Sequence, residues 1–465
     1  GLSGLELIYD NFLTGAYGAI KYLSDAKGKK LELTESYIKP QDGMNITLTV
    51  NYKLQASLER ELDNAVSKYN PDQALGIAMN PKTGEILAIA SRPTFSPANY
   101  NDYKIEDINR NLPIWMTYEP GSTFKIITLA TALEEHKIDL DNDHFTDTGS
   151  VQVENARIKC WKHGGHGLQT YLQVVENSCN PGFVSIGNKL GKETLFKYIR
   201  NFGFGTKTGV DLNGEASGIL FNLDKVGPVE LATTSFGQGV SVTPIQQITA
   251  VSAAINGGTL LKPYIVKSIN EPETNTVIKE NNPTKVRKVI SEETSEKVRY
   301  ALESVVTNGT GRTAFIDGYR VGGKTGTAQK VKDGRYMIGN YIVSFIGFLP
   351  ANDPEVVVYI AIDNAKGVTQ YGGTIAGPIA RNVLLDAIDI LKIEKPGGAS
   401  DKKYNYNDLK YYEVPDVVNL DIKEAMKSLK NFKVEYTGTG DKVIYQSPSA
   451  KTRLQEGSVV RLLTG

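Results

Sequence analysis

Strand-forming runs that lie on both sides of a long, helix-rich stretch constrain the fold of this chain more than any other feature. Residues 74–79 and 85–90 flank the turn at residues 80–84, and this pattern predicts a β-hairpin. Strand-like runs return at residues 341–349 and 356–362, after a middle region with helical periodicity. A sheet closed by such distant segments predicts an α+β fold, with helices packed on an antiparallel sheet.

The C-terminal part of the sequence has the pattern of a separate small module. A Pro- and Gly-containing stretch and a charged, Tyr- and Asn-rich run predict a linker over residues 395–411. Beyond it, Ile422, Ala425, Met426 and Leu429 share one helical face. Strand-like segments follow at residues 433–436, 443–446 and 458–463, so residues 412–465 are predicted to form an αβββ module.

Composition excludes some classes of function. Lys+Arg and Asp+Glu both total 52 of the 465 residues, so the net charge is zero and no nucleic-acid partner is expected. No stretch approaches the roughly 20 apolar residues that span a bilayer. The first residues, GLSG, carry neither a Met nor a signal-peptide pattern, which predicts a chain trimmed at its N-terminus.

Three short motifs carry the functional argument, although each alone is a weak signal. Ser-x-x-Lys and Ser-x-Asn both recur, and Lys-Thr-Gly occurs three times, so chance explains any single match. Context favours Ser122 and Lys125, because the sequence EPG precedes them and the apolar run 126–133 follows. Pro and Gly before a buried helix predict a sharp entry that places Ser122 at the helix N-terminus. Lys125 lies one turn later, and loss of hydration there favours a neutral amine that can act as a base.

Context also favours the Lys-Thr-Gly motif at residues 324–326. Two glycines precede it, and glycine in a strand allows another backbone to approach closely. Cationic Lys324, the hydroxyl of Thr325 and a bare strand edge can hold a peptide carboxylate and add the peptide as an extra strand. The N–H groups of Thr327 and Ser122 are predicted to form an oxyanion hole, with each donor worth roughly 3 kcal/mol.

These motifs, in the order Ser122/Lys125, Ser178/Asn180 and 324–326, form the set named for penicillin-binding proteins and class A β-lactamases. Residues 42–391 resemble a class B penicillin-binding protein transpeptidase domain, also through the stretches FGQG (236–239), VTP (242–244) and NGG (256–258). The C-terminal module resembles a PASTA domain through VPDV (414–417) and QSP (446–448). The resemblance implies a transpeptidase domain at 45–394, with residues 1–44 as the remnant of a pedestal domain.

The resemblance also implies roles for individual residues. Ser122 would attack the penultimate D-Ala carbonyl of a peptidoglycan stem peptide, and Lys125 would take its proton. Ser178 would relay a proton to the leaving amine, while Asn180 would hold the substrate amide and orient Lys125. Lys324 and Thr325, followed by Gly326 and Thr327, would bind the carboxylate of a substrate or of a β-lactam.

Partners and location follow from the same resemblance. A class B enzyme with a PASTA module resembles the transpeptidases of sporulation, which implies work on the spore cortex or cell wall. The implied location is the outer face of the cell membrane, or the forespore membrane, with a single N-terminal anchor. A glycosyltransferase of the SEDS type is the implied protein partner.

Both cysteines and two of the four histidines lie close to the Ser-x-Asn motif. Cys160, His163 and His166 fall within seven residues, and Cys179 is the middle residue of the motif itself. Thiolate and imidazole gathered in one loop suit tetrahedral Zn²⁺, so we expect a structural site of Cys160, His166 and Cys179, with Asp147 or His163 as the fourth ligand. Two alternatives stay open: inert buried thiols, and a Cys160–Cys179 disulfide.

Several readings compete with the transpeptidase. A class A β-lactamase would add a Glu-x-x-Leu-Asn motif, and none follows Ser178. A D,D-carboxypeptidase differs in accepting water, which the sequence does not exclude. A catalytically inactive wall-binding scaffold is disfavoured because all three motifs are intact. The PASTA-like module either binds wall peptide or β-lactam, or it braces the catalytic domain.

Overall fold

The computed structural model describes residues 1–31, 36–332, 334–395, 411–455 and 457–465. The chain divides into two compact units, Gly1–Ser400 and Asp401–Gly465. Most of the predicted linker, residues 396–410, lies outside the described residues. No helix among the described residues is both long and apolar enough to cross a membrane.

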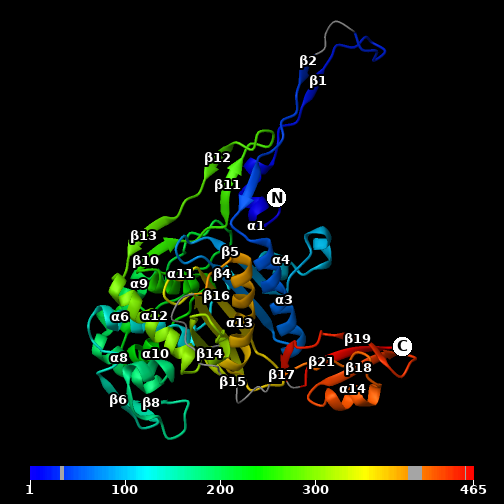
Figure 1. Ribbon diagram of the computed structural model, residues 1–465. Helices are drawn as coiled ribbons and strands as arrows, with labels where there is room; N and C mark the ends of the chain where they lie inside the picture. The colour runs from blue at the N-terminus through cyan, green and yellow to red at the C-terminus, as the bar shows by residue number, and fades with distance from the viewer. Residues whose placement is uncertain (32–35, 333, 396–410, 456) are drawn as a thin grey trace. The chain divides into compact units, whose positions relative to one another are not determined.

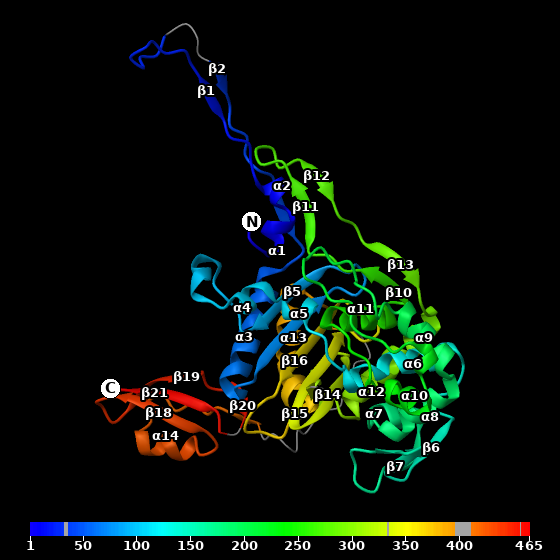
Figure 2. The same cartoon turned by 180° about the vertical axis from the view of Figure 1, so that it is seen from behind.

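A five-stranded antiparallel sheet forms the centre of the first unit (Figures 1 and 2). Its order is β14-β15-β16-β4-β5, so strands from the two ends of the sequence lie side by side, as predicted. The strands are β4 (Gln73–Met79), β5 (Ile86–Arg92), β14 (Gly322–Lys332), β15 (Arg335–Leu349) and β16 (Val356–Asp363). Strand β15 begins six residues before the predicted run, because its first half is mostly exposed and lacks the hydrophobic signal.

Helices cover both faces of this sheet. Helices α3 (Tyr52–Tyr69) and α13 (Gly372–Leu391) pack together on one face, and α5 (Leu112–Trp115), α11 (Pro244–Ile255) and α12 (Glu292–Thr307) lie on the other. The side chain of Asn51 caps α3, which buries Leu54, Leu58 and Leu62 on one stripe. The result is the predicted α+β arrangement.

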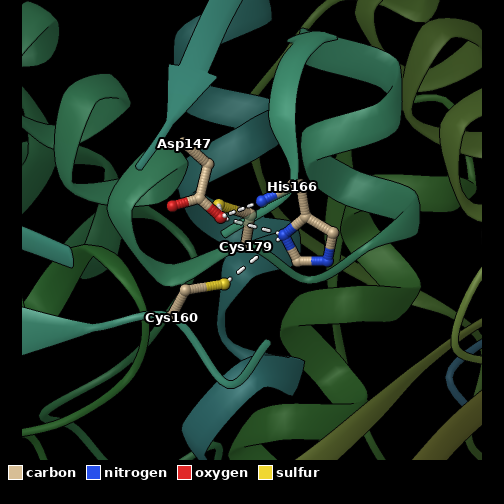
Figure 3. Close-up of side chains that lie close together, drawn as sticks. All are labelled: Asp147, Cys160, His166 and Cys179. Carbon is tan, nitrogen blue, oxygen red and sulfur yellow. Dashed lines mark hydrogen bonds and ion pairs between the residues drawn. The ribbon is translucent and has the colours of Figure 1, made fainter. Parts of the chain in front are cut away.

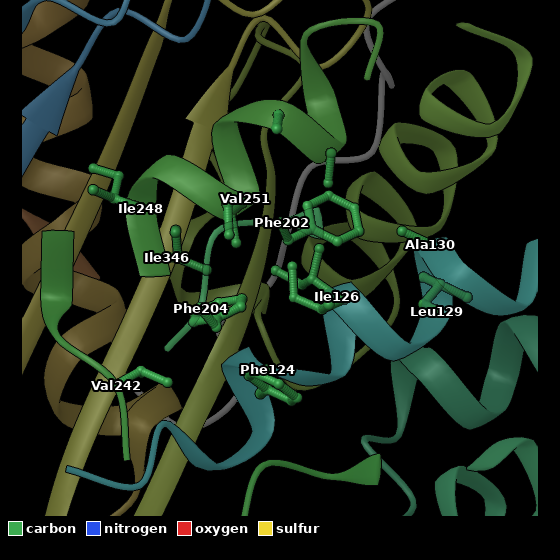
Figure 4. Close-up of a cluster of buried hydrophobic side chains, with 14 of the residues drawn as sticks. Phe124, Ile126, Leu129, Ala130, Phe202, Phe204, Val242, Ile248, Val251 and Ile346 are labelled. Atoms are coloured by element: carbon green, nitrogen blue, oxygen red, sulfur yellow. The ribbon is translucent and has the colours of Figure 1, made fainter. Parts of the chain in front are cut away.

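The middle of the chain forms a helical region next to the sheet. It contains α6 (Lys125–Glu134), α7 (Tyr171–Glu176), α8 (Asn180–Leu190), α9 (Lys192–Asn201) and α10 (Pro228–Ser235). Helix α6 is buried all round, since every residue from Lys125 to Leu133 is inaccessible to solvent or nearly so. Figure 4 shows Phe124, Ile126 and Leu129 gathered with apolar side chains such as Phe202 and Val251. A helix that is apolar all round belongs in a core.

Shorter elements complete the first unit. The helices are α1 (Gly4–Ile8), α2 (Asp10–Leu13), α4 (Ile105–Asn109) and the 3₁₀ turns η1 (Pro97–Asp102), η2 (Gly121–Thr123), η3 (Leu223–Lys225) and η4 (Arg312–Ala314). The strands are β1 (Ala19–Lys21), β2 (Ser36–Ile38), β3 (Asn45–Leu48), β6 (His144–Asp147), β7 (Ser150–Val153), β8 (Ala156–Lys159), β9 (Gly167–Thr170), β10 (Thr259–Lys262), β11 (Val266–Asn270), β12 (Val277–Glu280) and β13 (Thr284–Lys288).

The second unit is the predicted αβββ module. Helix α14 (Ile422–Ser428) is followed by β18 (Lys433–Gly438), β19 (Val443–Ser447) and β21 (Val459–Thr464), in the sheet order β18-β21-β19. The structure also contains a short antiparallel pair that was not predicted, β17 (Tyr411–Glu413) with β20 (Arg453–Gln455). Ala425 and Leu429 enter the core as expected, whereas Met426 is 47% exposed. The helix has only seven residues, so its buried stripe is narrower than the predicted face.

Candidate active site

The predicted nucleophile lies in a tight turn at the entrance to helix α6. Ser122 is the middle residue of η2, which continues through Phe124 into the helix. The turn begins at Gly121, whose φ of 55° is in the left-handed region that glycine adopts without strain. The N–H of Gly121 donates to the carbonyl of Gly237 at 3.0 Å, which holds the turn in place. Ser122 is thus half-buried at the start of a rigid helix, as predicted.

Strand β14 passes directly beside this turn. A Cβ on Gly326 would lie 3.0 Å from Cγ2 of Thr123 and 2.2 Å from Oγ of Ser344, so the close approach requires glycine there. The carbonyl of Thr327 faces the turn, 3.1 Å from where a Cβ of Gly121 would stand. Because a strand residue presents its N–H and C=O to the same side, the Thr327 N–H also faces the Ser122 turn. This arrangement suits the predicted oxyanion hole.

Lys125 connects the first motif to the second. Its Nζ donates to the carbonyl of Ser178 at 2.8 Å and to Oδ1 of Asn180 at 2.7 Å, and lies 3.2 Å from Oγ of Ser178. The ammonium also lies 5.1 Å from the ring centre of Phe183. The predicted contact between Lys125 and Asn180 is therefore present.

Lys324 brings the third motif to the same hydroxyl. Its Nζ donates to Oγ of Ser178 at 2.8 Å and lies 3.3 Å from Oγ1 of Thr325. Both lysines are fully buried. Three segments far apart in the chain thus meet at the hydroxyl of Ser178, and one of them is the start of α6, where Lys125 lies one turn after Ser122.

Burial sets the protonation of the two lysines. Loss of hydration lowers the pKa of Lys125 to about 7, although the nearby thiols of Cys179 and Cys160 partly oppose the shift. Burial lowers the pKa of Lys324 well below its ordinary value as well, and the charge of Lys125 lowers it further. A neutral Lys125 amine is able to accept the proton of Ser122.

The second motif has an unusual backbone. Ser178 has a φ of 51°, in the left-handed region, at the junction between α7 and α8. The N–H of Ser178 donates to the carbonyl of Val175, and that of Cys179 donates to the carbonyl of Val174. This turn points the Ser178 hydroxyl at both lysines, and a strained backbone at such a position is typical of functional sites.

The lowered pKa of Lys125 predicts how acylation depends on pH. The base must be neutral, so the acylation rate is expected to rise with pH through about 7 and to gain about tenfold between pH 6 and pH 8. The measurement is the second-order rate constant for labelling by a fluorescent penicillin at each pH. A rate that stays flat from pH 6 to pH 8 would contradict the assignment of Lys125 as the base.

The predicted metal ligands form a compact cluster that includes Cys179, the residue after Ser178 (Figure 3). Ligand atoms of Asp147, Cys160, His166 and Cys179 all lie within 4.8 Å of one another. His166 Nδ1 lies 2.9 Å from Oδ2 of Asp147 and 3.4 Å from Sγ of Cys160, and Cys179 Sγ lies 3.3 Å from Oδ2 of Asp147. Both cysteines are free thiols. His163, the alternative fourth ligand, is exposed and lies outside this group.

The cluster is buried and polarised. The interaction between the two neighbouring thiols lowers the pKa of Cys160 and, together with burial, raises that of Cys179. The pKa of Asp147 is held well below its usual range, because hydrogen bonds from Cys160, the Gly149 N–H and His166 outweigh its desolvation. The same Asp147 accepts a hydrogen bond from the backbone N–H of His166 at 3.0 Å, which ties the loop together.

Sequence reasoning missed the side chains that support the nucleophile turn from the sheet. Tyr118, just before the turn, shares a hydrogen bond with Tyr359 of β16, and both rings are buried. Thr123 donates to the carbonyl of Pro120 at 2.9 Å. No signal in the sequence indicates the tyrosine pair, since Tyr359 lies in an apolar strand and pairs with a residue 241 positions away.

The fold and the site define the class of protein: helices cover an antiparallel sheet, and a half-buried serine lies one turn before a fully buried lysine. This chain belongs to the penicillin-binding protein transpeptidase family: the model described as "Penicillin binding protein transpeptidase domain" matches residues 74–385. The model of the PASTA domain matches residues 412–465. Both resemblances drawn from the short motifs are confirmed.

Individual relatives agree with this assignment. The chain is 58% identical over 463 residues to "Stage V sporulation protein D" of Bacillus subtilis, covering 99% of this chain and 72% of that protein. It is 33% identical over 379 residues to "Peptidoglycan D,D-transpeptidase FtsI homolog" of Mesostigma viride, covering 76% of this chain and 62% of that protein. The solved structure of penicillin-binding protein 3 from Mycobacterium tuberculosis complexed with ampicillin is 27% identical, with a TM-score of 0.76. The match covers 86% of this chain and 87% of that chain.

Proposed function

We propose that this chain is a D,D-transpeptidase that cross-links peptidoglycan stem peptides through an acyl-enzyme on Ser122. The observation that carries the proposal is the hydroxyl of Ser178, which accepts hydrogen bonds from both Lys125 and Lys324 beside the Ser122 turn. The relatives named as a peptidoglycan D,D-transpeptidase and as a penicillin-binding protein complexed with ampicillin support it.

The reaction begins with transfer of the acyl group to the enzyme. Neutral Lys125 takes the proton of the Ser122 hydroxyl as its oxygen attacks the penultimate D-Ala carbonyl. The N–H groups of Ser122 and Thr327 stabilise the negative charge that develops on the carbonyl oxygen. The C–N bond then breaks, and protonated Lys125 passes its proton through the Ser178 hydroxyl to the departing D-Ala amine, which leaves Lys125 neutral again.

The second half of the reaction returns the enzyme to its starting state. The amine of a neighbouring stem peptide attacks the Ser122 ester and loses its proton to the same basic groups, and the Ser122 oxygen is released with a proton. During acylation, Lys324 and Thr325 are positioned to hold the terminal carboxylate of the donor peptide at the edge of β14, and this carboxylate leaves with the expelled D-Ala. A carboxylate arriving there favours the charged form of Lys324, whose pKa burial has lowered.

An acceptor assay and a nitrocefin assay distinguish the transpeptidase from the two alternative enzymes, a D,D-carboxypeptidase and a β-lactamase. With a stem-peptide thioester and a D-amino acid as acceptor, we expect incorporation of the acceptor in excess of hydrolysis. Hydrolysis alone would indicate a D,D-carboxypeptidase. Rapid, repeated cleavage of nitrocefin would indicate a β-lactamase, whereas the transpeptidase should stop after one equivalent. Ser122→Ala serves as the control in each assay.

The biological setting is part of the same proposal. The 58% sequence identity to a protein named for stage V of sporulation supports a role for this chain in synthesis of the spore cortex or wall. Such an enzyme acts on the outer face of the cell membrane or forespore membrane, where its substrate lies. A membrane anchor and a SEDS-type glycosyltransferase partner remain predictions of the family resemblance.

We further propose that Asp147, Cys160, His166 and Cys179 hold a structural Zn²⁺. Zinc bond lengths of about 2.0–2.3 Å in a tetrahedron place ligand atoms about 3.3–3.8 Å apart, and the pairs Cys160–His166 and Cys179–Asp147 already lie at 3.4 and 3.3 Å. A metal here would fix Cys179, and with it the Ser178 and Asn180 side chains on either side. The Ser122 nucleophile needs no metal-bound water, so the role is structural.

Metal content tests this site directly. Protein purified without added zinc is expected to carry about one equivalent per chain, and Cys160→Ser or His166→Ala should reduce this below a few tenths. His163→Ala is the matched control, because the exposed His163 lies outside the cluster and its loss should leave the metal bound. Less than a few tenths of an equivalent in the wild type, with two freely titrating thiols, would overturn the proposal. Loss of two hydrogens from the intact mass would instead indicate the disulfide.

A further inference from the structure

Glu119, three residues before Ser122, lies at the base of the nucleophile turn and is half-buried. Its Oε1 accepts a hydrogen bond from the N–H of Gly239 at 2.8 Å. Backbone hydrogen bonds lie on both sides of this contact, between Tyr118 and Val242 and between Gly121 and Gly237. The carboxylate therefore adds a side-chain hydrogen bond to the backbone hydrogen bonds that join the turn to residues 237–242.

The same carboxylate reaches the strand that carries the third motif. The hydroxyl of Tyr336 donates to Oε1 and Oε2 of Glu119, at 3.1 and 3.2 Å. Tyr336 lies near the start of β15 and pairs with Val331 of β14. Glu119 thus links the nucleophile turn to the far half of the β14–β15 hairpin.

This link is a second attachment between the same two elements. The first is the close packing of Gly326 and Thr327 against the turn, beside the catalytic centre. The second lies several residues further along the hairpin, where most side chains of β15 are exposed. One attachment lets a strand pivot, whereas two fix its orientation relative to the turn.

That orientation matters for acylation. The two predicted oxyanion donors, the N–H groups of Ser122 and Thr327, belong to the turn and to β14 respectively. They stabilise the transition state when both lie about 2.7–3.1 Å from the developing charge. Shifts of about 1 Å at such donors can cost up to a hundredfold in rate.

The chemistry of the contact suits a lasting attachment. Burial raises the pKa of Glu119, and the hydrogen bonds from Gly239 and Tyr336 oppose this shift. Hydrogen bonds to an ionised carboxylate are stronger than those between neutral groups. Burial, together with proximity to this carboxylate, also raises the pKa of Tyr336, so its hydroxyl keeps the proton that it donates.

We propose that Glu119 and Tyr336 are positioning residues for acylation, whose hydrogen bond fixes the β14 donor relative to the Ser122 donor. The inference rests on the proposed acyl-enzyme on Ser122 and adds a residue pair outside the three motifs. It predicts an effect on the rate of the chemical step rather than on ligand affinity, because neither side chain is assigned a contact with the ligand.

The test separates acylation into binding and chemistry. The rate of adduct formation is measured against penicillin concentration by stopped flow, which yields the dissociation constant and the limiting acylation rate. Tyr336→Phe removes one hydroxyl and should lower the limiting rate about tenfold, with the dissociation constant changed less than twofold. Glu119→Ala should have a larger effect, and Glu119→Gln, which keeps an acceptor oxygen, should recover part of it.

Two controls make the outcome decisive. Tyr300 of α12 has a hydroxyl that also contacts a carboxylate, that of Asp141. Tyr300→Phe therefore makes the same chemical change elsewhere and should leave both constants unchanged. The double variant Tyr336→Phe/Glu119→Ala should be no slower than Glu119→Ala alone, since the two act through one bond. An unchanged limiting rate in Tyr336→Phe would overturn the inference. A wild type that forms no adduct at all would instead overturn the proposed function.

Discussion

Replacing Lys125 with Met is expected to lower the acylation rate about a thousandfold while leaving the fold intact. Methionine has a similar length and suits a buried position, but it carries no basic nitrogen. General-base catalysis typically contributes 10²- to 10⁴-fold, and Lys125 is the buried amine one turn from Ser122 with a pKa of about 7. The second-order rate constant for labelling by a fluorescent penicillin measures the loss.

The matched control for this variant lies on the neighbouring helix. Lys189 of α8 is exposed, and its ammonium lies over the ring of Tyr171, as that of Lys125 lies over Phe183. Lys189→Met makes the same chemical change away from the site and should acylate at the wild-type rate. A Lys125→Met protein that still labels within tenfold of wild type, with an unchanged melting temperature, would show that another group is the base.

Removal of the Ser178 hydroxyl is expected to slow acylation about a hundredfold or more. This hydroxyl is bonded by Lys125 and Lys324 together, so its loss breaks the proposed proton path to the leaving amine. Ser178→Ala and Ser178→Gly should be equally slow in the fluorescent-penicillin assay, because both lack the oxygen.

Thermal stability, unlike activity, should distinguish those two variants. At a φ of 51°, glycine avoids the cost of roughly 1 kcal/mol or more that alanine meets in the left-handed region. The Gly variant should therefore melt at least as high as the Ala variant, although both are slow. If the Gly variant recovered activity, the backbone turn rather than the hydroxyl would be the functional feature.

The sequence was informative where local pattern and chemistry agree. The apolar run after Ser122 predicted a buried helix, and α6 has this feature. The strands of the sheet were found wherever burial produced an apolar run. The first half of β15 was missed because its side chains are exposed.

Several contacts between distant segments were beyond the reach of sequence reasoning. The spacing of Ser178 and Lys324 does not indicate that the lysine donates to that serine, 146 residues away. The partner of Tyr359 and the link from Tyr336 to Glu119 depend on how the sheet meets the nucleophile turn. The choice between Asp147 and His163 was open for the same reason, since only the packing of the β6–β9 region brings Asp147 inward.

The central claim is that Ser122 is the residue that forms the acyl-enzyme. Intact mass of the full chain after exposure to penicillin tests it most directly, in wild type and in Ser122→Ala. The wild type should gain the mass of one intact penicillin, and a peptide digest should place it on Ser122, whereas Ser122→Ala should gain nothing. An adduct that persists in Ser122→Ala, or that maps to another serine such as Ser178, would contradict the account.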